Sequence, residues 1–157
     1  MPGMTYLHDL FEYNRWANEL VLAATDQLSP EALAVEMPNL GGSALGLLEH
    51  TSRVEAAFLG LMTRLGEPRP RPEGYAAVRA LFASNSDGFQ EALPALEARL
   101  QEQLEVPWFE RSFTIEQLLT QVATHSVQHR AGICAGIALA GGTAPGLDYI
   151  MWLNENR

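Results

Sequence analysis

The chain has 157 residues, of which 47% are hydrophobic and 18% charged, and its formal net charge is −9. This length and composition predict one compact domain over residues 1–157 and argue against long disordered regions. The acidic charge argues against nucleic-acid binding, because a phosphate backbone would be repelled by most of the surface.

Cys134 is the single cysteine, so no disulfide can form within the chain. A reducing cytoplasm is therefore the expected compartment. The longest apolar stretch, residues 131–140, is about half of what a membrane span needs, and the N-terminus carries no signal-peptide pattern. We expect a cytoplasmic protein that does not contact membranes.

The N-terminal part predicts a helix over residues 4–27, in which apolar side chains recur at helical spacing. Ser29 and Pro30 then predict the cap and first position of a short helical turn. Asn14 and Asn18 fall on the apolar stripe of the first helix. They could bond to backbone or to one another in the core, or they could line a polar pocket.

Three more long helices are predicted, over residues 43–65, 75–105 and 114–140. Ser43 is the expected cap of the first of these, and Thr114 with Gln117 forms a capping box for the last. Pro94 is expected to kink or divide the helix that contains it.

The remaining segments are predicted as connections and one short helix. Every second residue of the segment 68–72 is proline, which predicts an extended loop. Residues 106–113 are expected to be irregular, and a short helix is expected over 147–153. The whole pattern predicts an all-α four-helix bundle.

Three histidines are the candidate metal ligands. His125 and His129 are four residues apart in one predicted helix, so both imidazoles lie on the same face. They fall on its apolar stripe, and His50 falls on the apolar stripe of the helix over 43–65. We therefore expect three imidazoles from two helices to point into the same interior.

A divalent cation would explain such a cluster, because charging adjacent imidazoles in a dry core is unfavourable, whereas each neutral ring can give a lone pair to the ion. Zinc or nickel is the expected metal, with iron and manganese as alternatives. Three protein ligands would leave one coordination position open. In the alternative without metal, the histidines form hydrogen bonds in the core or in a dimer interface.

Other metal motifs are absent. A di-iron bundle needs Glu-x-x-His pairs, and the residues three before the histidines are Leu47, Val122 and Ser126. Cys134 is five residues past His129, which rotates it away from the ligand face. His8 lies on another helix and is expected at the surface.

Three segments carry a family resemblance: residues 11–18 (Phe-Glu-Tyr-Asn-Arg-Trp-Ala-Asn), residues 47–50 (Leu-Leu-Glu-His) and residues 125–130 (His-Ser-Val-Gln-His-Arg). With Gly142, Tyr149 and Trp152 after them, they make the chain similar to the DinB/YfiT-like superfamily of small metal-binding four-helix bundles. One departure is that Ala131-Gly132 stands where the family usually has Gly-Gln.

The resemblance implies a bundle with one long crossover connection, a three-histidine metal site and, frequently, a homodimer. Characterised relatives include enzymes that use low-molecular-weight thiols such as mycothiol, bacillithiol or glutathione. It therefore favours a metal-dependent thiol transferase or hydrolase that acts on a small molecule. The alternative is a non-catalytic metal-binding structural or stress-response bundle.

Arg130 is the candidate cofactor-binding residue. It follows the ligand His129 directly, and its guanidinium could hold a carboxylate of a thiol cofactor. A surface or inter-helix salt bridge is the alternative role for this side chain. No general base can be identified, because helical rotation points Glu49 and Glu55 away from His50.

Overall fold

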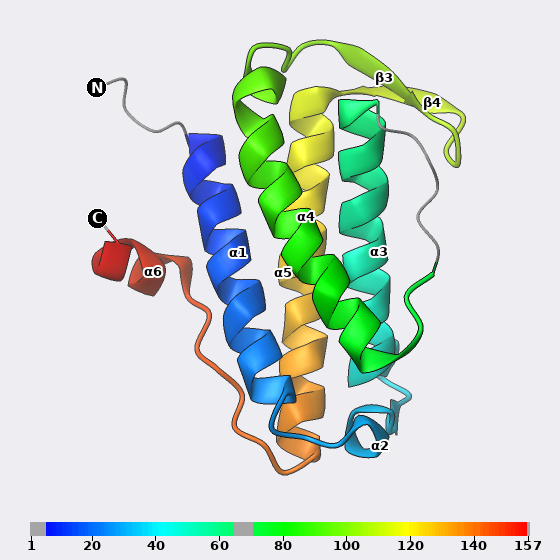
Figure 1. Cartoon of the computed structure of the whole chain (residues 1–157), viewed down its shortest axis with the longest axis vertical. Helices are drawn as coiled ribbons and strands as arrows, with labels where there is room; N and C mark the ends of the chain where they lie inside the picture. The colour runs from blue at the N-terminus through cyan, green and yellow to red at the C-terminus, as the bar shows by residue number, and fades with distance from the viewer. Residues whose placement is uncertain (1–5, 65–70, 157) are drawn as a thin grey trace.

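The computed structural model describes residues 6–64 and 71–156, and most of them are helical. Four long helices lie side by side (Figure 1): α1 (Tyr6–Thr25), α3 (Ala44–Thr63), α4 (Gly74–Glu97) and α5 (Ile115–Leu139). Two short helices, α2 (Pro30–Leu33) and α6 (Tyr149–Asn156), complete the set within the described ranges. None of these helices is long and apolar enough to cross a membrane.

The helix starts predicted from capping residues are confirmed. The Ser29 side chain accepts a hydrogen bond from the Ala32 N–H, with Pro30 in the first turn. Ser43 likewise accepts from the Gly46 N–H, and Thr114 forms the predicted capping box with Gln117. These oxygens satisfy N–H groups that have no partner inside their helix.

The four long helices surround one core. α3 contacts α4 and α5, and α1 contacts the same two helices, so α1 and α3 lie at opposite corners. α3 and α4 run in the same direction in Figure 1. The end of α3 and the start of α4 therefore lie at opposite ends of the bundle. Part of the predicted 68–72 loop lies outside the described residues.

Two small sheets were not predicted. In the first, β1 (Glu36–Met37) pairs with β2 (Gly42–Ser43), and in the second, β3 (Gln103–Val106) pairs with β4 (Arg111–Thr114), both antiparallel. The helix predicted over 75–105 is wrong after residue 97, and the connection predicted as irregular over 106–113 is a hairpin.

The error arises because the helical spacing of the leucines continues past the end of the helix. α4 runs through Pro94 as one helix and ends at Glu97, so Pro94 does not divide it. Leu96, Leu100 and Leu104 continue the helical spacing, but Leu104 pairs with Phe113 in the hairpin. The side chains of Leu100 and Leu104 reach the same core from non-helical backbone.

The core includes two large apolar clusters with a polar layer between them, and a smaller third cluster of Tyr13, Ala17 and Trp152. The cluster nearer the β3–β4 hairpin includes Phe11, Phe58, Phe89 and Val122. The other large cluster includes Val21, Leu48, Phe82 and Ile133. On every long helix, buried polar residues stand between the two clusters: Asn14, Asn18, Thr51, Ser52, Glu55, Asn85, Ser126 and Arg130.

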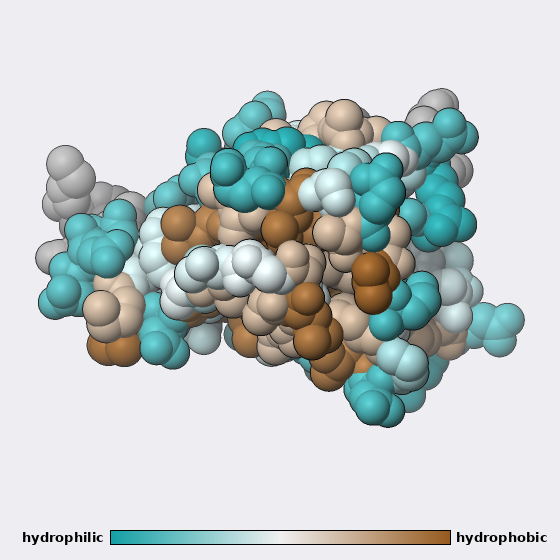
Figure 2. Space-filling model, turned by 90° about the horizontal axis from the view of Figure 1, so that it is seen from below, coloured by the Kyte–Doolittle hydropathy of each residue, from teal (hydrophilic) through white to brown (hydrophobic). Residues whose placement is uncertain are grey.

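The end of the molecule that carries α2 exposes apolar side chains, which are seen from below in Figure 2. Val35, Leu40 and Leu139 are respectively 63%, 44% and 74% exposed. This surface lies at the opposite end of the molecule from the β3–β4 hairpin (Figure 1).

Candidate metal centre

Three imidazoles converge where α3 and α5 pack against each other. The Nε2 atom of His125 lies 3.0 Å from Nε2 of His50 and 3.0 Å from Nε2 of His129. All three potential ligand atoms lie within 4.8 Å of one another. The two helices therefore bring together the three histidines that the sequence predicts as one cluster.

The cluster lies at the edge of the helix pair and not in the core. His125 and His129 are half-buried, while His50 is exposed. The expectation that all three point into the interior is therefore wrong for His50. The core-facing positions of α5 belong instead to Ser126 and Arg130, one residue further along the chain. As a result, the cluster is accessible from one side.

The environment of His125 and His129 favours their neutral forms. Burial lowers the pKa of His125 to about 4, and the neighbouring imidazoles of His129 and His50 act in the same direction. Burial, followed by the effect of His50, also lowers the pKa of His129. Neutral rings carry the free lone pairs that a metal ion requires.

The donor set could hold a metal ion. Two nitrogens bound at the usual Zn–N length to a tetrahedral ion lie ~3.3 Å apart, and two of the three Nε2 pairs here are separated by 3.0 Å. In the part of the chain that the structure describes, no Cys, Asp or Glu joins this group. Cys134 and His8 are both outside it, as expected from their positions on the helices.

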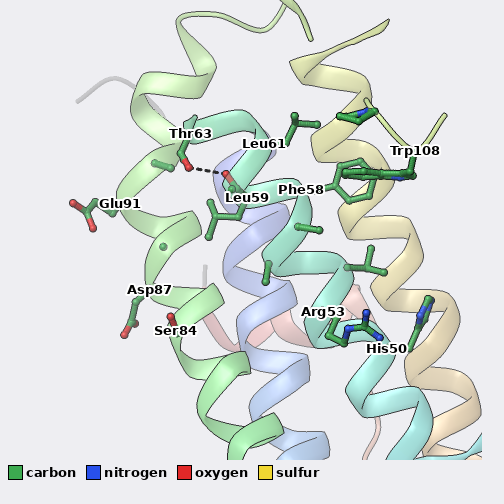
Figure 3. Close-up of a pocket in the computed structure, with 17 residues that line it drawn as sticks. His50, Arg53, Phe58, Leu59, Leu61, Thr63, Ser84, Asp87, Glu91 and Trp108 are labelled. Carbon is green, nitrogen blue, oxygen red and sulfur yellow. Dashed lines mark hydrogen bonds between the residues drawn. The ribbon is translucent and has the colours of Figure 1, made fainter. Parts of the chain in front are cut away.

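A groove of about 1280 Å³ begins at His50 and follows the outer side of α3 (Figure 3). Arg53 lies next to His50 in its lining. Further along, the side chain of Trp108 from the hairpin packs edge-on against Phe58, with ring centroids 5.5 Å apart. Residues of α4, among them Asp87 and Glu91, line the groove on the other side of α3.

Beneath the histidines, the carboxylate of Glu55 is enclosed by hydrogen-bond donors from three other helices. Glu55 is 1% exposed. Its Oε1 accepts from Asn14 Nδ2 at 3.0 Å, Asn18 Nδ2 at 3.2 Å and Ser126 Oγ at 2.9 Å. Asn85 of α4 approaches its Oε2 at 3.5 Å. A buried charge needs such partners, because it has lost its water.

Arg130 is the basic member of the same layer. It is 2% exposed, and its Nη1 donates to Asn14 Oδ1 at 2.6 Å and to Asn18 Oδ1 at 2.8 Å. Burial lowers the pKa of Arg130, while Tyr13 and Glu55 oppose that shift. Its guanidinium thus makes an inter-helix contact, linked to Glu55 through two asparagine amides.

One interpretation of the sequence was that Asn14 and Asn18 bond to backbone or to each other in the core. Their side chains instead join a buried acid, Glu55, to a buried base, Arg130. The buried position of Glu55 was not predicted from the sequence. The available signal was the spacing of Thr51, Ser52 and Glu55, which places polar groups on one buried face of α3.

Comparison with known proteins agrees with this architecture. The crystal structure of a DinB-like protein from Bacillus cereus ATCC 10987 has a TM-score of 0.64 and 22% sequence identity, and the match covers 83% of this chain and 90% of that one. At this identity the likeness shows the fold alone. No curated protein matches the chain. The model of the DinB family matches residues 1–156, so the chain belongs to the DinB family.

Proposed function

We propose that His50, His125 and His129 hold one divalent metal ion, zinc or nickel, and that the protein is a metal-dependent enzyme acting on a small molecule. The observation that carries this proposal is the convergence of three Nε2 atoms beside an open groove. Structural zinc sites normally use four protein ligands, whereas catalytic sites leave one position for water or substrate. The described residues supply three.

The reaction class that we propose is thiol-dependent transfer or hydrolysis. A bound divalent ion supplies Lewis acidity, which lowers the pKa of a thiol or water in its open position. The chain itself would orient the reactants. Phe58 and Trp108 offer an apolar wall in the groove, which would hold an apolar substrate and keep water from that side.

The polar layer supports the site from below. Ser126 and Arg130 fix α5 against Glu55, Asn14 and Asn18. Since His125 and His129 directly precede these two residues, the buried bonds also limit how far the imidazoles can move. Residues that hold the supporting element in place commonly tune metal sites.

A second candidate function is a non-catalytic site, in which the ion links α3 to α5 within a stress-response bundle. The observation in its favour is that the ligands come from both helices, so that binding would clamp them together. We also propose a homodimer, which the family resemblance suggests, and a cytoplasmic location, which the single cysteine suggests.

The test of the metal centre is the metal content of purified protein, measured by elemental mass spectrometry after incubation with zinc or nickel. We expect about one ion per chain in the wild type, and loss of the ion in His125→Ala. The matched control is His8→Ala, which removes a histidine outside the cluster and should retain the ion. Absence of bound metal in the wild type would refute the proposal.

Turnover decides between the two candidate functions. The metal-loaded protein is assayed with glutathione, bacillithiol or mycothiol and small electrophiles, and separately with ester and amide substrates. Conversion that disappears in His125→Ala and persists in His8→Ala supports an enzyme. Full metal loading without any conversion supports the non-catalytic alternative.

A further inference from the structure

Arg53 stands beside the proposed metal centre without a role in it. It is three residues after His50 on α3, so the two side chains are neighbours on the helix surface. Both line the groove, and Figure 3 shows them on the same side of α3. The Arg53 side chain is 50% exposed. A ligand that reached the open coordination position would therefore pass close to this guanidinium.

The ion pair that Arg53 makes with Glu49 is weak. The Nη1 atom of Arg53 lies 3.9 Å from Glu49 Oε1, which is longer than a hydrogen bond. The close partner of Glu49 is Arg71, whose Nε donates to the same oxygen at 2.5 Å. An exposed pair of this kind contributes little to stability. Arg53 can therefore turn toward a ligand at small cost, while Arg71 keeps Glu49 neutralised.

The charges along the groove are distributed unevenly. Asp87 and Glu91 line it from α4, on the far side of α3 from His50. Arg53 places the positive charge at the histidine end, on a chain whose net charge is −9. Between these ends the lining includes Ala57, Phe58 and Trp108. A negative group is thus favoured next to the metal centre and disfavoured along α4.

We propose that Arg53 is the anion-binding residue of this site, and that it selects metal-binding small molecules that carry a carboxylate close to their donor atom. This inference rests on the proposed function, because it assumes an ion held by the three histidines. A guanidinium binds a carboxylate through two parallel N–H···O bonds. Arg130 cannot take this part in the described conformation, since it is 2% exposed and bonded to Asn14 and Asn18.

The experiment compares two thiols of nearly the same shape: 3-mercaptopropionate, which carries a carboxylate, and 3-mercaptopropionamide, which carries a neutral amide in its place. Each is titrated into cobalt(II)-loaded protein, and binding is followed by the sulfur-to-cobalt charge-transfer absorption. Cobalt accepts imidazole ligands as zinc does. We expect the wild type to bind the carboxylate thiol about tenfold more tightly than the amide, as a charge-assisted hydrogen bond at a half-exposed site suggests.

Substitution then assigns the preference to one residue. Arg53→Gln should lose most of the tenfold preference and bind the amide as the wild type does. The matched control is Arg15→Gln, which removes an arginine of similar exposure, paired with Glu19 at the same i, i+4 spacing, and should keep the preference. Arg53→Lys should retain part of it. Circular dichroism of each variant verifies that the helices are intact.

The outcomes separate the inference from the proposed function. Equal binding of the two thiols by the wild type, or a preference that survives in Arg53→Gln, overturns the role of Arg53 and leaves the open metal site standing. If neither thiol changes the spectrum of the cobalt protein, the open coordination position itself is refuted, and the inference falls with it.

Discussion

On α5, two histidines and the residues that directly follow them, Ser126 and Arg130, have opposite environments. His125 and His129 are half-buried, and their Nε2 atoms contact the ring nitrogens of other imidazoles in the cluster. Ser126 and Arg130 are buried, and they bond to a carboxylate and to amide oxygens from α3 and α1. A shift of one residue along the helix thus separates a cluster of imidazoles from a network in which an acid, a base and amides bond to one another.

The polar layer and the imidazole cluster differ in whether they require a ligand from outside the chain. In the polar layer, acid, base and amides bond to one another, and of its described side-chain atoms Asn85 Oδ1 and Arg130 Nη2 lack a hydrogen-bond partner. The chain itself therefore supplies most of the contacts that this region requires. The imidazole cluster holds three similar rings at short distances, and a cation would give their lone pairs a shared partner. Breaking each region in turn should therefore give different responses.

The largest effect is expected from Glu55→Ala. This substitution leaves the buried donors of Asn14, Asn18 and Ser126 without their acceptor, and it leaves the Arg130 charge without its counter-charge. Removing one partner of a buried pair lowers the free energy of unfolding by about 3–5 kcal/mol. Urea unfolding followed by circular dichroism measures the change.

Glu49→Ala is the matched control for this experiment. Glu49 is on the same helix, but its ion pairs with Arg53 and Arg71 are at the surface, so the expected loss is below about 1 kcal/mol. Similar losses in the two variants would mean that the buried layer contributes no more to stability than a surface ion pair.

A smaller effect is expected from adding metal. A ligand that binds only the folded state stabilises it by about 2.7 kcal/mol at a free concentration 100 times its Kd. For a chain of this size, that corresponds to a rise in Tm of about 5–10 °C. Thermal unfolding with zinc and with chelator measures the rise, which should vanish in His125→Ala. An equal rise in that variant would place the bound ion elsewhere.

Local signals explain which parts of this architecture the sequence could predict. Ser43 and Thr114 fix helix starts through bonds to residues three positions away, so their roles can be seen in the sequence. The spacing of His125 and His129 likewise determines that they share a face. Such short-range features, together with the apolar periodicity, were sufficient for the four long helices and for the histidine cluster.

Long-range partners explain what the sequence could not show. The β3–β4 hairpin depends on the pairing of Leu104 with Phe113, and the helical spacing of the leucines concealed it. The buried position of Glu55 depends on Asn14 and Ser126, which lie 41 and 71 residues away along the chain. The exposure of His50 depends on how α3 is rotated against α5, and a stripe a few residues wide does not fix that rotation.

The smallest effect concerns pH in the metal-free protein. Because burial lowers the pKa of His125 from 6.5 to about 4, the unfolded chain gains a proton near pH 6.5 while the folded chain does not. The free energy of unfolding should therefore fall as pH drops below about 6.5, by at most about 1.4 kcal/mol per pH unit, which amounts to no more than about 2 kcal/mol for His125 between pH 7 and pH 5. The arginine partners of Asp26 and Glu102 lower the pKa values of these carboxyl groups, so their protonation also lowers the free energy of unfolding, but only below their ordinary pKa values of 3.8 and 4.5.

Urea midpoints measured between pH 7 and pH 5 in the presence of chelator therefore report on the imidazoles. His125→Gln should flatten this dependence, whereas an unchanged slope would show that the cluster does not hold His125 neutral.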